Sequence, residues 1–288
     1  MPTTHPHMPF PPVLHDDGAM TAVVTQPPQL LDGAWLMTVS LPPALTLTPR
    51  GGQFVLARSG AQSEFERAEH WPTALRTPLY VASSRTAVLL AGVAPTGLEW
   101  ELAIPVHGYD DNQWVRQLMV GARLNLLGPL GQGFFAQPQA RNLLLLADAA
   151  RLPLLFAIME QMLDQGGRVT LVLRADTLAA DLRSRLPIPV ELRLATTDHE
   201  FAQQLPDTMR WADQVAAALP NDAYATLVEP IRAARFRLEP GFAHAWVEAD
   251  LACGVGACLA CAVPLPDGSR TRACVHGPVF DLAALLGR

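Results

Sequence analysis

Close to the C-terminus the chain reads Ala252-Cys-Gly-Val-Gly-Ala-Cys-Leu-Ala-Cys-Ala262, a segment that holds three of its four cysteines. The fourth, Cys274, follows after twelve intervening residues, which makes the full spacing Cys-x4-Cys-x2-Cys-x12-Cys. Four thiolates are the ligand set of one iron–sulfur cluster, and the first three follow the spacing of plant-type ferredoxins. The sequence therefore predicts a 2Fe-2S centre, and with it electron transfer, on Cys253, Cys258, Cys261 and Cys274.

The residues between the cysteines suit this chemistry. Gly254 and Gly256 accept positive φ and let the backbone approach closely, so that its N–H groups can be aimed at sulfur. Beyond the third cysteine, Pro266-Asp-Gly-Ser269 is a turn sequence between a short strand at Val263–Leu265 and a returning strand at Arg270–Cys274. We expect this hairpin to bring Cys274 to the loop.

Two other interpretations compete with the cluster. A pair of disulfides fits the even cysteine count. A Cys-x2-Cys pair in a glycine loop is poorly placed, however, to form two disulfides between distant parts of the chain, and no secretory signal is recognisable. Structural zinc is the stronger alternative, because four-thiolate tetrahedral sites also use Cys-x2-Cys pairs. Zinc ribbons usually carry two such pairs on separate loops, whereas here three ligands share one loop. The spacing favours the cluster and leaves zinc open.

Composition limits the remaining classes. The chain has 288 residues, 50% of them hydrophobic, and its length predicts two or three domains with sizeable cores. Apolar runs such as Leu143–Ala147 and Val169–Leu173 have the length of strands and are far too short to span a bilayer. A net charge of -6 without a basic block argues against a nucleic-acid partner. Since all cysteines fall in one reduced site, we expect a cytoplasmic protein.

Three regions follow a proline-rich start, giving an α+β multidomain fold. We expect a disordered tail over residues 1–20 and an antiparallel β-barrel over residues 21–137, where short strands are punctuated by Gly, Pro and polar turns. A parallel α/β sheet is expected over residues 138–240, and a 2Fe-2S loop module over residues 241–288. In the second region we expect strands at Asn142–Ala147, Arg168–Leu173, Val190–Ala195 and Tyr224–Val228, and helices at Pro153–Leu163, Leu178–Leu186 and Thr208–Leu219.

This order of regions resembles the electron-transfer subunit of two-subunit dihydroorotate dehydrogenase, in the ferredoxin-reductase-like superfamily. Besides the cysteine motif, the resemblance rests on Gly51-Gly-Gln-Phe-Val55, Leu127-Gly-Pro-Leu-Gly-Gln-Gly-Phe134 and His276-Gly-Pro-Val-Phe-Asp281. It implies that the barrel holds FAD, that the α/β domain receives NADH, and that the cluster passes electrons to a separate FMN-containing catalytic subunit in pyrimidine biosynthesis.

The flavin motif of that family, Arg-Pro-x-Ser or a relative of it, corresponds here to Arg76-Thr-Pro-Leu-Tyr80. The resemblance makes Arg76, Pro78, Leu79 and Tyr80 the candidate FAD-binding residues. Arg76 stands one residue early, however, and Tyr80 takes the position of the serine. A phosphate-binding Gly-Thr turn has no counterpart between Val106 and Leu118, where Asp110-Asp111 would place negative charge near the diphosphate.

The nicotinamide site departs further from the family. The glycine-rich turn that a dinucleotide needs after the first parallel strand is replaced by Ala147-Asp-Ala-Ala-Arg-Leu-Pro153. Asp148, in a good N-cap position, would itself occupy the positive end of the helix dipole. The family's Cys-Gly-Pro near the nicotinamide corresponds to residues Ala225–Arg232, which bring in Glu229. We therefore expect no NAD binding and no independent NADH oxidation, and no catalytic residue is assigned.

Two functions remain for such a chain. The first is an electron-transfer subunit with a 2Fe-2S cluster and FAD, in a hetero-oligomer with a flavin-containing dehydrogenase catalytic subunit. The second is a non-catalytic iron–sulfur relay or scaffold that has lost flavin and NADH binding. Four apolar residues near the cluster, Val255, Leu259, Val279 and Phe280, predict a partner-binding patch, unless Val279 and Phe280 pack beneath the cluster as core.

Overall fold

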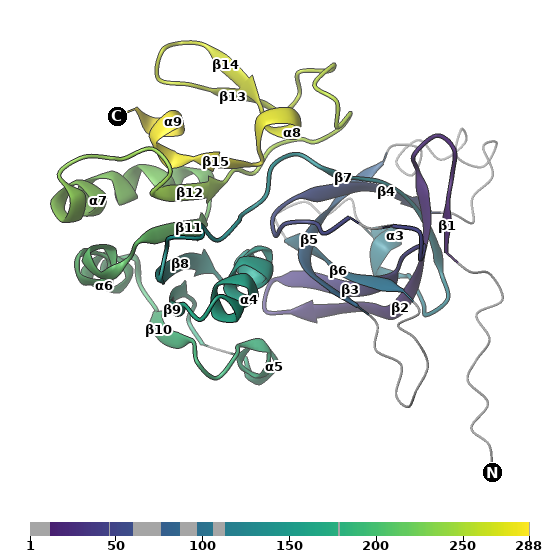
Figure 1. Ribbon diagram of the computed structural model, residues 1–288, viewed down its shortest axis with the longest axis horizontal. Helices are drawn as coiled ribbons and strands as arrows, with labels where there is room; N and C mark the ends of the chain where they lie inside the picture. Colours follow the sequence, from purple (N-terminus) through teal and green to yellow (C-terminus); the bar gives the residue numbers. More distant parts are fainter. Residues whose placement is uncertain are drawn as a thin grey trace.

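The computed structural model describes residues 12–45, 47–59, 76–86, 97–105, 113–177 and 179–287. Within these ranges the chain forms a β-barrel, a six-stranded α/β sheet and a C-terminal loop-and-hairpin segment that lies beside both (Figure 1). The sequence-based expectations for residues 107–112 and for the first eleven residues fall outside the described ranges. Within them, the fold class expected from the sequence is confirmed.

The barrel consists of six antiparallel strands in the order β2-β3-β6-β5-β4-β7, closed by pairing of β2 with β7. These strands are β2 (Met20–Leu31), β3 (Ala34–Ser40), β4 (Phe54–Ser59), β5 (Thr77–Thr86), β6 (Leu98–Pro105) and β7 (Arg123–Leu130). Alternate side chains, among them Val55, Leu79 and Trp100, fill the interior, and the short helix α3 (Gln113–Arg116) adds Val115 to this core. A short strand, β1 (Val13–Leu14), pairs with β2, so these two residues do not belong to a disordered tail.

The second sheet has the order β10-β9-β8-β11-β12-β15, parallel except where β12 meets β15. Its strands are β8 (Asn142–Asp148), β9 (Arg168–Arg174), β10 (Glu191–Ala195), β11 (Gln214–Ala218), β12 (Ala243–Trp246) and β15 (Val279–Asp281). The connections contain η1 (Leu152–Leu155), α4 (Phe156–Asp164), α5 (Ala180–Arg185), α6 (Asp198–Trp211), η2 (Asn221–Leu227) and α7 (Val228–Arg235), and α9 (Leu282–Leu286) follows β15. The central strand β8 buries Leu143–Ala147 without a break, as a parallel strand covered on both faces should.

Two sequence-based expectations in this sheet were wrong. The helix expected at Thr208–Leu219 ends at Trp211, and residues Gln214–Ala218 form β11, while the strand expected at Tyr224–Val228 is helical. Gln-Val-Ala-Ala-Ala has a composition that favours helix, but all five residues are buried between β8 and β12, and this packing overrides their propensity.

The boundary expected between residues 240 and 241 also differs from the structure. β12 and β15 are strands of the α/β sheet, so residues 241–288 do not form a module of their own. The cysteine-containing segment lies between these two strands, as an insertion at one side of the sheet (Figure 1). None of the helices in the described part of the chain is long and apolar enough to cross a membrane.

Candidate iron–sulfur site

The four cysteines lie between β12 and β15. A loop after Trp246 carries Cys253 and Cys258, and Cys261 directly precedes β13 (Ala262–Pro264). This strand pairs with β14 (Arg270–Arg272), which leads into the short helix α8 (Ala273–His276). The expected hairpin is therefore present, although Cys274 lies in the first turn of α8 rather than in the returning strand.

The sulfur atoms are arranged as two pairs. Cys261 and Cys274 are buried with their Sγ atoms 3.2 Å apart, and the Ala273 N–H donates to the Cys261 carbonyl at 2.9 Å, which fixes the hairpin beneath them. Cys253 and Cys258 form the second pair, joined by a hydrogen bond between their side chains. Cys253 is half-buried and Cys258 is exposed.

Backbone N–H groups point at the sulfurs of both pairs. The Gly256 N–H donates to Cys274 Sγ at 3.1 Å. Hydrogen bonds to the backbone of Cys258, and after it of Val255, lower the pKa of Cys253 to about 6. Burial, with the thiol of Cys261 second, raises the pKa of Cys274 to about 12. Donors directed at sulfur are what thiolate ligands of a cluster require.

The loop needs its glycines. Gly254 has φ +69°, and a Cβ there would come within 2.9 Å of the side chains of Leu56 and Leu130 on the barrel. Gly256 has φ +75°, and a Cβ there would lie 2.9 Å from the side chain of Val275. Leu259, exposed between the second and third cysteines, adopts φ +60° although it carries a side chain. Left-handed backbone at these positions turns the loop around the sulfurs and seats it against the barrel.

The donor set fits a two-iron cluster better than a zinc ion. Each iron of such a cluster takes two thiolates, which matches two sulfur pairs. A tetrahedral zinc ion needs all four sulfurs around one point. Cys253, Cys258, Cys261 and Cys274 would hold the cluster, which would supply one-electron redox chemistry.

Three motifs that are distant in the sequence meet beneath this loop. The Phe134 N–H donates to the Gly51 carbonyl at 2.8 Å, and the Gln53 side chain donates to the Gly131 carbonyl at 2.8 Å. Gln132 forms a bridge to Pro278, which joins the segment leaving the barrel to the segment after α8. Val279 and Phe280 are buried there, so they are core and not part of an exposed patch. Val255 and Leu259 remain 65% and 60% exposed, as expected.

The candidate FAD residues have other contacts in this structure. The Arg76 guanidinium donates to the carbonyls of Leu56 and Asn125 at 3.0 and 3.1 Å and to the Asn125 side chain at 2.6 Å, which ties β4 to β7. Leu79 points into the barrel core. Tyr80 packs edge-on against Trp246 with ring centroids 5.1 Å apart, and burial raises its pKa. Pro78 is half-buried in β5, the strand that also holds Leu79 and Tyr80.

At the carboxyl edge of the α/β sheet the structure corrects two expectations. Asp148 accepts a hydrogen bond from the Arg151 N–H at 2.9 Å, but the N-cap of η1 is Arg151, so Asp148 caps the preceding turn and not the helix. Glu229 lies in α7 with an exposed side chain, whereas the residues that follow β11 are Leu219, Pro220 and Asn221. Sequence reasoning assigned no role to Glu248, because the residue that pairs with its carboxylate, Arg151, lies 97 residues away in the chain.

Comparisons with known proteins agree with this site. Residues 248–286 match the model of the iron-sulfur cluster binding domain of dihydroorotate dehydrogenase B. The chain is 32% identical over 176 residues to the electron transfer subunit of dihydroorotate dehydrogenase B (NAD(+)) from Geobacillus thermodenitrificans, covering 57% of this chain and 65% of that one. The corresponding subunit from Streptococcus mutans is 25% identical, over 59% of this chain and 68% of its own length. The chain thus spans just under two thirds of the first of these relatives.

Solved structures show the same architecture. An NADH-dependent reduced ferredoxin-NADP oxidoreductase superposes with a TM-score of 0.66 at 20% identity, covering 92% of this chain and 89% of that one. Phthalate dioxygenase reductase gives a TM-score of 0.57 at 11% identity, with 91% and 78% covered. These matches establish the fold. With its barrel, its α/β sheet and its inserted cysteine segment, the chain is similar in sequence to the electron transfer subunits of dihydroorotate dehydrogenase B and similar in fold to these reductases.

Proposed function

We propose that the chain is an electron-transfer subunit that carries one 2Fe-2S cluster on Cys253, Cys258, Cys261 and Cys274. The observation that carries this proposal is the arrangement of four thiols as two pairs with backbone N–H groups directed at sulfur. It is supported by the position of all four within the segment that matches an iron-sulfur cluster binding domain. A set of free thiols of this kind persists in a reducing compartment, so we place the protein in the cytoplasm.

For the partner we propose a flavin-containing catalytic subunit of the dihydroorotate dehydrogenase type, which would place the chain in pyrimidine biosynthesis. The named relatives are electron transfer subunits of that enzyme. The exposed ligand Cys258 is flanked by exposed Val255 and Leu259, and apolar side chains in the open around a redox site are typical of a protein interface. Electrons would enter or leave the cluster at this loop.

FAD is proposed as a second centre on the fold alone, because the barrel is of the type that serves FAD-binding reductases. The contacts of Arg76, Leu79 and Tyr80 favour the other candidate, a cluster relay without flavin. Both candidates share the cluster and the partner, and they differ only in whether the barrel contributes a flavin.

A visible spectrum of the anaerobically purified chain, followed by pull-down from the native cell at modest salt, tests the proposal. We expect cluster absorption that bleaches with dithionite, and co-purification of a flavoprotein dehydrogenase. Additional flavin bands from the isolated chain would select the FAD-containing form, whereas cluster bands alone would select the relay. A strictly monomeric chain with no redox protein attached would contradict an electron-transfer subunit.

A further inference from the structure

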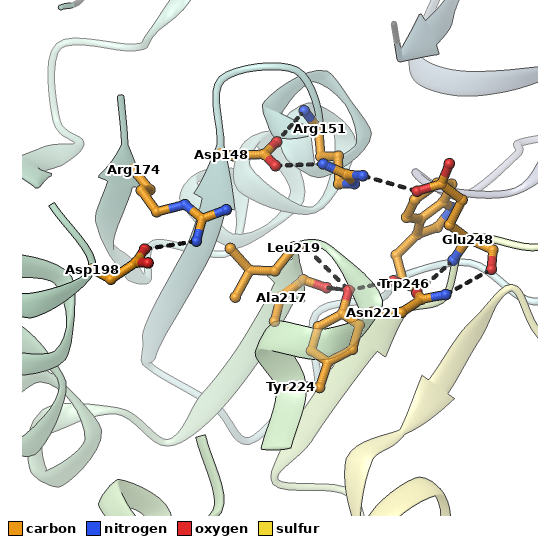
Figure 2. Close-up of polar contacts among 10 residues, drawn as sticks. All are labelled: Asp148, Arg151, Arg174, Asp198, Ala217, Leu219, Asn221, Tyr224, Trp246 and Glu248. Carbon is orange, nitrogen blue, oxygen red and sulfur yellow. Dashed lines mark hydrogen bonds and ion pairs between the residues drawn. The ribbon is translucent and has the colours of Figure 1, made fainter. Parts of the chain in front are cut away.

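The carboxyl edge of a parallel sheet is where α/β folds bind nucleotides, at the point where the strand order reverses. Here the chain passes from β8 to β9 and β10 on one side and returns as β11 and β12 on the other, so the reversal lies between β8 and β11. Asp148 ends β8, Asn221 lies just beyond β11, and Glu248 lies just beyond β12. These side chains therefore meet at the edge that a dinucleotide would occupy (Figure 2).

An arginine joins the carboxylates of this edge. The Arg151 guanidinium pairs with Asp148 at one end and with Glu248, at 2.8 Å, at the other (Figure 2). Arg151 is only 8% exposed, and the side chains of Asp148 and Glu248 are 15% and 37% exposed. A guanidinium this deeply placed between two carboxylates is neutralised within the chain and is not presented to a phosphate.

The backbone that leads to the cluster is fastened at the same point. Asn221 donates from its side chain to the Glu248 carbonyl at 2.9 Å and accepts from the Glu248 N–H at 3.0 Å. The Tyr224 hydroxyl accepts from the Leu219 N–H at 3.0 Å and donates to the Trp246 carbonyl (Figure 2). The segment between Trp246 and Glu248 is thus held on both sides, five residues before the first ligand, Cys253.

The barrel packs against this edge of the α/β sheet. Tyr80 packs against Trp246, and the turn between β2 and β3 brings Gly33 so close to Ala150 that a Cβ on the glycine would lie 3.1 Å from the alanine Cβ. Farther along the edge, Arg174 at the end of β9 is paired with Asp198 at 2.9 Å. The three ion pairs described here contain three carboxylates and two guanidinium groups, a balance unfavourable to an added diphosphate.

We propose that Arg151, clamped between Asp148 and Glu248, is a positioning residue that closes this edge to dinucleotides and fixes the segment leading to Cys253. The inference deepens the proposed function, since the fixed segment carries the first cluster ligand. The ion pairs of Arg151 with Asp148 and Glu248 then lie where other proteins of this fold bind a dinucleotide. Closure and fixation follow from the same contacts, and each has its own measurement.

The test compares Arg151→Ala, Arg151→Lys and the control Arg174→Ala in the full chain with its cluster. Hydrogen–deuterium exchange over residues 246–252 reports fixation, and equilibrium dialysis with NADH reports closure. We expect exchange in this segment to accelerate at least about tenfold in Arg151→Ala, because the variant removes the guanidinium that joins Asp148 to Glu248. Arg151→Lys should restore part of the protection, Arg174→Ala should match the wild type, and the wild type should bind no NADH.

A second measurement distinguishes a role of Arg151 in positioning the segment that leads to the cluster from a role in stabilising the fold alone. The electron paramagnetic resonance spectrum of the reduced cluster should broaden in Arg151→Ala, with iron content per chain unchanged, and should sharpen again in Arg151→Lys. If Arg151→Ala does not fold, Glu248→Gln replaces it, since the amide keeps the volume and the backbone bonds to Asn221 while removing the charge.

Unchanged exchange in these variants, equal acceleration in Arg174→Ala, or NADH binding by the wild type would overturn the proposal. A wild-type chain without iron would instead defeat the proposed function. The exchange and dialysis results would still decide whether the edge is closed and the segment fixed.

Discussion

Cys274 comes from outside the loop that holds the other three ligands, and its sulfur is buried against that of Cys261. We expect Cys274→Ser to lose or destabilise the cluster, because a hydroxyl is a poor substitute for a thiolate on iron. Iron and labile sulfide per chain measure the loss, and circular dichroism checks that the β-structure persists. Val275→Ser, in the same short helix, is the matched control and should keep its iron. Full iron content in Cys274→Ser would remove this residue from the ligand set.

His244 on β12 gives the fold a pH dependence with a definite sign. Burial lowers the pKa of His244 below its usual value of 6.5, while the carboxylate of Asp281 opposes the shift. The unfolded chain therefore takes up this proton at a higher pH than the folded chain does. The stability that the folded chain gains by keeping His244 neutral is fully present above about pH 6.5. It is lost as the pH falls towards the lowered pKa.

We therefore expect the urea midpoint to decrease from about pH 7 to about pH 5, and His244→Gln to reduce that decrease. Urea titrations of both chains at several pH values provide the measurement. The same decrease in both chains would show that another group is responsible.

Among the elements, the cluster loop depends on contact with the barrel as well as on backbone shape. Gly254 and Gly268 both have positive φ, but a Cβ on Gly254 would press on Leu56 and Leu130, whereas nothing lies within 4 Å of one on Gly268. Gly268→Ala should cost the left-handed penalty of about 1–2 kcal/mol. Gly254→Ala should cost at least about 1 kcal/mol more, from overpacking. Denaturant unfolding of both variants tests this, and equal costs would mean that the loop does not rest on the barrel.

Elements with a strong local pattern could be predicted from the sequence, and elements defined by distant partners could not. The barrel strands, the first βαβ units and the cysteine hairpin follow from periodicity, turn residues and spacing. β11 was mistaken for helix because its alanines acquire strand structure only between β8 and β12. In the site, the four cysteines that we propose as ligands follow from spacing alone. The Asp148–Arg151–Glu248 network was not, because it joins residues 97 positions apart in the chain.

At the scale of the whole molecule, the exposed apolar side chains of the cluster loop should dock the partner. We expect Val255→Asp and Leu259→Asp to abolish co-purification of the dehydrogenase subunit, because each places a charge in the core of an apolar interface. Ile188→Asp is the control, since Ile188 is fully exposed on the α/β domain before β10. Iron content should stay unchanged in all three variants. Survival of the complex in both loop variants would place the interface elsewhere.

The cluster itself is the central claim, and metal and sulfide analysis of the anaerobically purified wild-type chain tests it most directly. Ligation of a 2Fe-2S cluster by two pairs of thiolates predicts about two irons and about two acid-labile sulfides per chain. One equivalent of zinc with no labile sulfide would contradict the account.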